Sequence, residues 1–483
     1  MRFLILAGDR AKDLDPAQAL VMYERALSLA PEGDPVRAEI LHDLGFVEFT
    51  RGRYGRSRDL LQEAIPALRA AGKPARAADA NVLLPLVLHT IAPSTAHQRL
   101  LDEAIVELEG LPPGKELVGA YAMRAGWDSA SGMNLEAIGW ANKSLFLAEE
   151  LGLPESPMAR INRGRARWWS GDVGGPEDIR LGIDLALEQG SVLLAAYGYE
   201  DLSSARSESE GPSAGLRELD AGAALALKSG VLDAAELIDV NRTDLLRALG
   251  RWDEAMDTAT NYLAGDREDG NAGIQLGCQL LVCDLSTWRG DLDRASELPH
   301  DVNLAVRAFG QAQIVVYGLS IVANLALATG NVDRAVGVLH ELEAYPNVRE
   351  ALYYAECLPQ LVRLALRAVG IEFAHQLAMG VPESPKALPR ISIEMVEAQL
   401  AEARGELDRA VELYASAEEG WRMFSVPERA QSLLGRGRCL LAMDDPGAAA
   451  VLRDAGKVFA SLKAELYMPE VNSLLEQAVA RSS

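Results

Sequence analysis

Apolar residues recur along this chain at the three-to-four-residue spacing of amphipathic helices, in pairs of stretches separated by a glycine. Residues 34–72 show the pattern clearly. The apolar positions are Ile40, Leu41, Leu44 and Val47 in the first stretch and Leu60, Leu61, Ile65 and Leu68 in the second. Gly52 lies between the stretches, where glycine accepts a positive φ without strain. The pattern predicts two antiparallel helices, 35–50 and 54–70.

The turn glycine returns with a nearly constant period. Gly132, Gly171, Gly211, Gly250, Gly290, Gly330 and Gly370 are spaced 39, 40, 39, 40, 40 and 40 residues apart. Several of them open similar phrases, such as Gly-Arg-Trp-Asp-Glu-Ala at 250–255 and Gly-Asp-Leu-Asp-Arg-Ala at 290–295. A fixed period of this size is typical of stacked repeats, which share one continuous core. We therefore expect about twelve units that fill residues 1–483 as a single solenoid.

The repeat resembles the tetratricopeptide repeat. Residues 45–64 match its pattern of small and packing positions, and residues 405–417 match it again. The matching residues are Gly45, Gly52, Ser57, Leu61 and Ala64 in the first case and Gly405, Ala410, Tyr414 and Ala417 in the second. The resemblance implies an all-α fold, a right-handed superhelical solenoid of helix-turn-helix units.

A column of small residues lies seven positions before each turn glycine. Eight of ten such positions are small, including Gly45, Gly164 and Cys283, whereas Pro85 and Arg363 depart. Close approach of two helices requires small side chains there. Cys283 is therefore expected to be a packing residue and not a nucleophile, and the units around 75–110 and 348–380 are expected to be irregular.

Two polar, turn-rich segments interrupt the repeat, near 264–273 and near 380–390. Each is expected to be either a hinge between subdomains or a long loop between repeats. Residues 464–480 contain Glu465, Glu470, Asn472, Glu476 and Gln477. Because a terminal repeat needs a polar outer face, we expect this segment to form a C-terminal capping helix.

Composition and motifs argue against catalysis and against nucleic acid as a ligand. The net charge is −23, from 70 acidic and 47 basic residues, so phosphate is opposed and a basic or neutral partner is favoured. The four cysteines form no disulfide framework, which suggests a reducing, cytoplasmic location. Phosphate-loop, zinc-protease and nucleophile-elbow motifs are absent from the sequence. We expect no enzyme activity, no cofactor, no metal and no membrane span.

The binding surface is expected on the concave side of the solenoid. In tetratricopeptide proteins the first helix of each repeat lines the groove, through residues a few positions before the turn glycine. This wider set includes Gln360 and Arg367. The residues selected as the groove are Arg165, Trp168, Trp169, Asp244, Arg247, Asp284, Trp288, Tyr317 and Asn324. Aromatic residues with arginine dominate protein interfaces. The alternative for Trp168 and Trp288 is packing against the next helix.

Residues 398–450 carry a second resemblance, together with Tyr353-Tyr354 and the segment 148–154. They are similar to the C-terminal repeat arrays of bacterial signalling proteins that join a STAND-type ATPase to a class III nucleotide cyclase-like domain, and of LuxR-type ATPase regulators. The resemblance implies a non-enzymatic scaffold or sensor that binds a protein or peptide. The alternative is an array that senses a small-molecule effector. The sequence does not fix the oligomeric state, nor whether the chain is free-standing or a segment of a larger protein.

Overall fold

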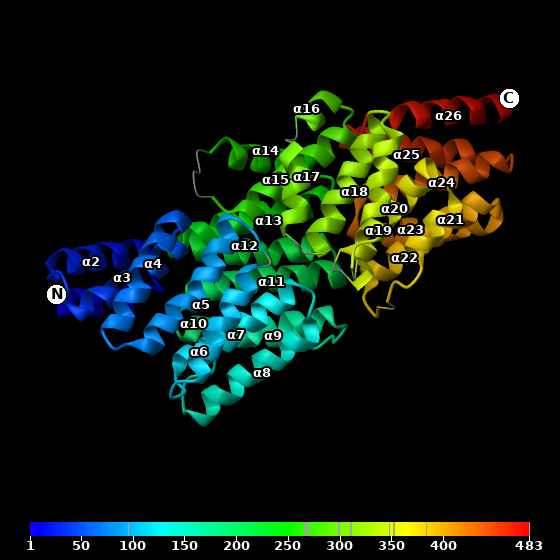
Figure 1. Cartoon of the computed structure of the whole chain (residues 1–483). Helices are drawn as coiled ribbons and strands as arrows, with labels where there is room; N and C mark the ends of the chain where they lie inside the picture. The colour runs from blue at the N-terminus through cyan, green and yellow to red at the C-terminus, as the bar shows by residue number, and fades with distance from the viewer. Residues whose placement is uncertain are drawn as a thin grey trace. The chain divides into compact units, whose positions relative to one another are not determined.

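The computed structural model describes residues 1–94, 96–265, 270–297, 300–309, 312–346, 348–350, 353–382 and 384–482. In these ranges all regular structure is helical, with 26 α-helices, one 3-10 helix and no strand (Figure 1). The chain forms two compact units. Unit 1 comprises 1–205, 216–241 and 265–275, and unit 2 comprises 206–215, 242–264 and 276–483.

Unit 1 begins with helices that lie wholly inside it. They are α1 (Arg2–Ala11), α2 (Pro16–Leu29), α3 (Pro35–Thr50), α4 (Tyr54–Ala70), α5 (Pro74–Ile91), α6 (Ala96–Glu109), α7 (Lys115–Ala130), α8 (Asn134–Glu150), α9 (Pro157–Trp169) and α10 (Gly175–Glu188). Four helices run from one unit into the other. They are α11 (Val192–Glu210), α12 (Pro212–Lys228), α13 (Leu232–Ala248) and α15 (Ala272–Trp288).

The remaining helices belong to unit 2. They are α14 (Trp252–Ala264), α16 (Leu292–Ser296), α17 (His300–Phe309), α18 (Ala312–Ala328), α19 (Val332–Glu343), η1 (Val348–Glu350), α20 (Tyr354–Ala368), α21 (Ile371–Ala378), α22 (Ala387–Arg404), α23 (Leu407–Phe424), α24 (Val426–Ala442), α25 (Ala448–Leu462) and α26 (Met468–Ser482).

Each unit is built from antiparallel helix pairs in two layers. Consecutive helices pack as pairs, for example α3 on α4, α7 on α8, α22 on α23 and α24 on α25. The first helices of successive pairs also contact one another, from α3 to α5, α7 and α9 in unit 1 and from α18 to α20, α22 and α24 in unit 2. We call this second set (α18, α20, α22 and α24) the inner helices of unit 2. The predicted all-α solenoid of tetratricopeptide-like units is confirmed.

The turn glycines behave as the period predicts. Gly52, Gly132, Gly250 and Gly330 have φ values of 71°, 82°, 75° and 78°, a region that favours glycine. In the last full repeat Asp444 takes the equivalent position, with φ 55°. Because an aspartate tolerates this conformation better than most residues, the turn survives without a glycine.

The small-residue column places two helices of a pair in close contact. A Cβ on Gly45 would lie 2.9 Å from Leu61 Cδ2, and one on Gly164 would lie 2.6 Å from the Gly175 carbonyl oxygen. Cys283 is 1% exposed, which confirms that it packs in the core. Pro85 stays inside α5, and Arg363 forms a bidentate ion pair with Glu428.

The interruptions of the repeat are only partly described. Residues 266–269 of the predicted break near 264–273 and Glu383 of the segment near 380–390 lie outside the described residues, so the hinge and loop alternatives stay predictions. The final helix begins at Met468 rather than at residue 464. Lys463 takes a left-handed conformation that ends α25, and a turn follows it.

Candidate functional site

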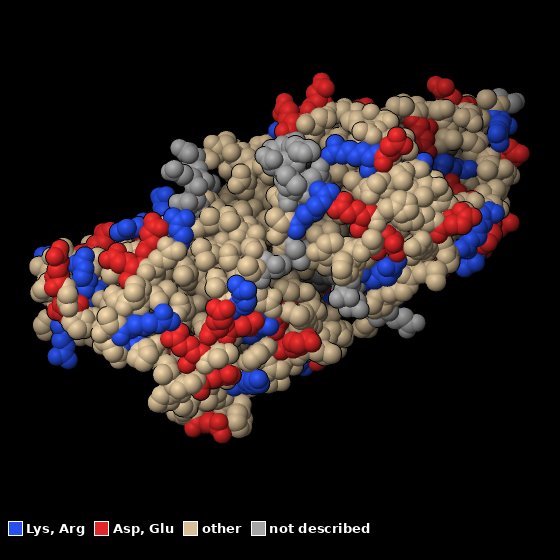
Figure 2. Space-filling model, in the orientation of Figure 1, with Lys and Arg blue, Asp and Glu red and all other residues tan. Residues whose placement is uncertain are grey.

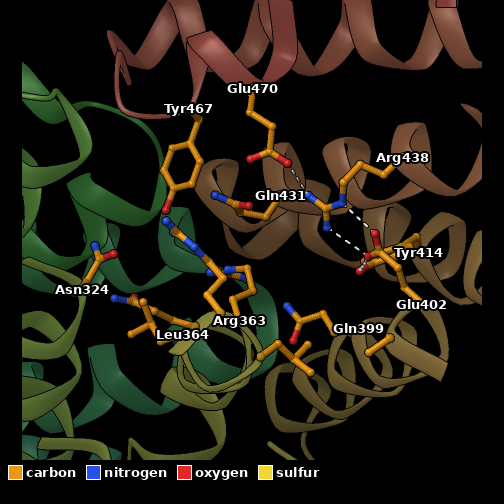
Figure 3. A pocket seen from close by; sticks show the side chains of 14 residues that line it. Asn324, Arg363, Leu364, Gln399, Glu402, Tyr414, Gln431, Arg438, Tyr467 and Glu470 are labelled. Atoms are coloured by element: carbon orange, nitrogen blue, oxygen red, sulfur yellow. Dashed lines mark hydrogen bonds and ion pairs between the residues drawn. The ribbon is translucent and has the colours of Figure 1, made fainter. Parts of the chain in front are cut away.

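The inner helices of unit 2 surround a cavity of about 370 Å³. The start of α26 and the residue before it close one side, as Figure 3 shows. Its polar lining consists of Asn324, Gln360, Arg363, Arg367, Gln399, Glu402, Tyr414, Gln431, Arg438, Tyr467 and Glu470, and its apolar lining of Leu364, Leu366 and Ala403.

The repeat itself explains why these side chains converge. Asn324, Leu364, Gln399 and Arg438 each lie six residues before the turn position of their unit, counting from Gly330, Gly370, Gly405 and Asp444. Equivalent positions on stacked helices point the same way, so each repeat contributes one of these side chains to the same wall.

Four side-chain amides of this cavity have a polar atom without a hydrogen-bond partner. They are Asn324 Nδ2, Gln360 Nε2, Gln399 Oε1 and Gln431 Nε2. Asn324, Gln399 and Gln431 are only 2%, 3% and 4% exposed. An unpaired buried polar group costs about 1–3 kcal/mol, and native proteins contain few of them. Such a group therefore lies beside the cavity on each of the four inner helices, α18, α20, α22 and α24.

Arg363 and Arg438, two of the three arginines that line the cavity, are paired with carboxylates. Arg363 donates two hydrogen bonds of 2.6 Å to Glu428. Arg438 donates to Glu402 at 2.7 and 3.0 Å and to Glu470 at 3.0 Å, and the dashed lines in Figure 3 trace these contacts. Bidentate pairs of this kind hold the arginines in fixed positions. Arg367 lies exposed at the cavity wall.

A second polar cluster lies in unit 2 on α13, α15 and α18. Tyr317 Oη donates to Asp244 Oδ1 at 3.4 Å, and the Arg247 guanidinium lies 5.9 Å from the centre of the Tyr317 ring. Arg247 Nη1 is 3.8 Å from Asp284 Oδ2. Arg247 Nε and Asp284 Oδ1 have no hydrogen-bond partner. Four of the nine predicted groove residues, Asp244, Arg247, Asp284 and Tyr317, are thus brought together.

The surroundings of this cluster disfavour charge on its acids. Burial raises the pKa of Asp244 and of Asp284, and the nearby Arg247 guanidinium opposes both shifts. On α20, burial and the carboxylate of Glu208 raise the pKa of Glu356 to about 8. Asp244 is nevertheless exposed, whereas Asp284 is only 2% exposed.

Two aromatic rings connect the cluster with the cavity. Trp288 follows Asp284 on α15 by one helical turn, and its ring centre lies 4.8 Å from that of Tyr467, which lines the cavity. The Leu466 backbone N–H donates to the Trp288 carbonyl at 3.2 Å. The turn before α26 therefore packs on α15, and Tyr467 takes part both in this contact and in the cavity lining.

The other predicted groove residues fall in different places. Asn324 lines the cavity. Trp168 and Trp288 are only 6% and 3% exposed, so these indoles pack inside the protein, as the packing alternative predicts, and expose little surface to a partner. Their positions lie next to the small-residue column, where the helices of a pair touch.

Arg165, Trp168 and Trp169 belong to unit 1, whereas the cavity and the second polar cluster lie in unit 2. Arg165 donates to the Gly126 carbonyl at 2.8 Å and to Ser129 Oγ at 3.2 Å, and it pairs with Asp201 at 3.4 Å. Its guanidinium lies 5.3 Å from the centre of the Trp169 ring. These contacts occupy most donors of Arg165, which leaves little of the guanidinium for a ligand.

Sequence reasoning missed part of the cavity for an identifiable reason. Gln399 and Glu402 lie six and three residues before Gly405, and Arg438 lies six before Asp444. Counting back from Gly405 would have selected Gln399 and Glu402. Arg438 could not be found in this way, because the turn after it has no glycine. Gln431 lies thirteen residues before Asp444, as Tyr317 does before Gly330.

The outer surface differs from this interior. Over α18–α23, Figure 2 shows Lys and Arg side chains beside Asp and Glu rather than a patch of one sign. Within the described ranges no group of three His, Cys, Asp or Glu side chains could hold a metal ion. No helix of the described chain is long and apolar enough to cross a bilayer.

Comparison with known proteins gives distant structural likeness only. No family model and no curated protein matches the chain. The human IFIT1 dimer with PPP-AAAA is 14% identical, with 95% of this chain and 94% of that one covered at a TM-score of 0.41. A Rap protein complexed with competence and sporulation factor is 11% identical, with 92% and 99% covered at 0.39. Yeast Tom70 is 12% identical, with 100% and 96% covered at 0.24.

Proposed function

We propose that this chain is a non-enzymatic binding module that holds a short extended peptide segment in the cavity of unit 2. The observation that supports this most directly is the set of four amides with unpaired polar atoms, one on each of four successive inner helices. An extended peptide offers an N–H and a C=O at every residue, and successive residues are about 3.3 Å apart along the chain. A row of amide side chains can pair with such a backbone whatever its sequence.

The affinity for the bound segment is increased because the side chains of the cavity are already ordered. The ion pairs of Arg363 and Arg438 fix the side chains around the amides, so little conformational entropy is lost on binding. Leu364 and Leu366 add apolar contact area between the polar groups. The ligand therefore replaces unsatisfied protein groups with hydrogen bonds at a small ordering cost.

A small polar molecule is the second candidate ligand. The cavity volume of about 370 Å³ falls at the lower end of the range of about 300–1,000 Å³ that is usual for small-molecule sites. Thermal-shift screening with metabolites distinguishes this candidate, since a true ligand raises the melting temperature by mass action.

The proposal that the chain is not an enzyme is supported by the pKa values of its cysteine thiols. Burial raises the pKa of Cys283, Cys357 and Cys439 to about 12, so very little nucleophilic thiolate forms. The similarity of residues 398–450 to arrays attached to STAND-type ATPases and LuxR-type regulators supports a role in bacterial, cytoplasmic signal transduction. The net charge of −23 supports a partner other than nucleic acid.

The experiment replaces two of the four amide side chains by apolar side chains of similar volume. A Gln360→Met/Gln431→Met variant keeps the side-chain length and loses two pairs of hydrogen-bonding atoms. On an array of blocked random heptapeptides we expect roughly tenfold weaker binding, because two hydrogen bonds contribute about 0.5–1.5 kcal/mol each. Gln62→Met, an exposed position on α4, is the matched control. Peptide binding that is equal in both variants would contradict the proposal.

A further inference from the structure

We propose that Asp244, Asp284 and Glu356 form a cation subsite on the inside of unit 2, which receives an ammonium or guanidinium group of the bound peptide. This inference rests on the proposed peptide-binding function and adds a charge requirement to it. The three carboxyl groups lie on α13, α15 and α20, so the subsite is assembled from separate repeats.

The first argument is the balance of charge. Glu208 is neutralised by Lys386, whose Nζ lies 2.7 Å from its Oε2, and both side chains are nearly buried. The cation that the remaining three carboxyl groups share is Arg247, and Lys386, already paired with Glu208, also acts on Glu356. When all three are ionised, they carry two negative charges more than Arg247 offsets, and burial raises the pKa of each carboxyl group. A cation from outside removes this excess.

The second argument is that Arg247 does not satisfy the acids it faces. Paired arginine and carboxylate groups normally approach to about 2.7–2.9 Å. Arg247 Nη1 stays 3.8 Å from Asp284 Oδ2, and Asp284 Oδ1 has no partner although Asp284 is 2% exposed. Asp244 receives only a long hydrogen bond of 3.4 Å from Tyr317. Hydrogen-bonding capacity for a further donor is therefore present on two of the three acids.

The third argument is access. Asp244 is exposed and Glu356 is partly exposed, whereas Asp284 is buried. The Trp288 and Tyr467 rings connect this cluster with the cavity. An arginine or lysine side chain of a peptide, or its own amino terminus, can thus reach Asp244 and Glu356 from solvent, in the same unit as the cavity.

The experiment uses matched peptides on the full chain. Each arginine-containing heptapeptide of the array has a twin in which citrulline, neutral and nearly isosteric, replaces arginine, and lysine and free-amino-terminus versions distinguish the source of the cation. Dissociation constants are then measured by calorimetry. We expect the cationic member of a pair to bind at least tenfold more tightly than its neutral twin.

The variant Asp244→Asn/Glu356→Gln removes two charges and keeps the shape of both side chains. It is expected to bind both members of a pair with the affinity that wild type has for the citrulline peptide. Glu63→Gln/Asp257→Asn makes the same change of net charge at exposed positions on α4 and α14 and is expected to keep the tenfold preference.

Each outcome decides between the two proposals. Peptide binding without a preference for the cationic twin overturns the subsite and leaves the binding function standing. Absence of binding by every peptide on the array overturns the binding function and the subsite with it. The comparison of twins on wild-type protein needs no variant, so a variant that fails to fold does not remove the test.

Discussion

At the scale of single residues, Glu356 links ligand binding to stability. Burial, the carboxylate of Glu208 and Asp244 hold the pKa of its carboxyl group at about 8, far above the ordinary value of 4.5. The folded state therefore binds a proton that the unfolded state releases between these two values. Stability contributed by this group is lost as the pH rises from about 4.5 to about 8.

Glu356→Gln is predicted to stabilise the protein at alkaline pH. The amide cannot ionise, so the variant avoids the cost of a buried charge, and we expect a gain of about 2 kcal/mol at pH 9 and almost none at pH 5. Melting temperatures of variant and wild type at the two pH values measure this difference. Glu63→Gln should show no such pH dependence, and a variant that is less stable than wild type at pH 9 would refute the assignment.

Residue positions were predictable from the period only where a glycine marks the turn. Counting back from Gly330 and Gly370 predicted Asn324, Gln360 and Arg367, which line the cavity. Arg438 was not found, because Asp444 adopts the positive φ in place of glycine. Counting also could not separate exposed from buried side chains, since Trp288 packs against Trp252 and Tyr467.

At the scale of helices, the period predicted the pairs and their order but not every boundary. The apolar spacing in 34–72 predicted helices at 35–50 and 54–70, and α3 and α4 have these bounds. The start of α26 moved to Met468 because Lys463 takes a left-handed conformation that no local pattern marks. Which acids lie close together depends on contacts between repeats, and a spacing rule within one repeat contains no such information.

Removal of α26 is predicted to cause aggregation. Val471 and Ala478 are buried, and Val471 packs close to Gly456 on α25. A chain that ends at residue 467 would expose the face of α25 that Val471 covers. Repeat proteins generally need a terminal repeat with a polar outer face in order to stay soluble. Size-exclusion chromatography compares this truncation with one that removes only residues 480–483. A monomeric, fully helical product from the longer truncation would disprove the capping role.

At the scale of the whole molecule, the two units are interwoven in sequence. Residues 206–215 and 242–264 belong to unit 2, although segments of unit 1 lie between them and after them. These two segments supply contacts inside unit 2. Glu208 pairs with Lys386, Gly250 lies against Leu462, and the Trp252 ring centre is 5.7 Å from that of Trp288. A single cut at residue 276 therefore does not release a complete unit.

This interweaving predicts a difference between two fragments. Residues 206–483 contain all of unit 2, whereas residues 276–483 lack both segments and with them Asp244, Arg247 and the partner of Lys386. We expect the longer fragment to melt at least about 10 °C higher, because loss of several buried contacts costs several kcal/mol. It should also retain the preference for cationic peptides, since the cavity and the cation subsite both lie in unit 2. Equal melting temperatures would show that the segments 206–215 and 242–264 do not stabilise the unit, and the cation subsite would then lack the fixed wall on which its geometry depends.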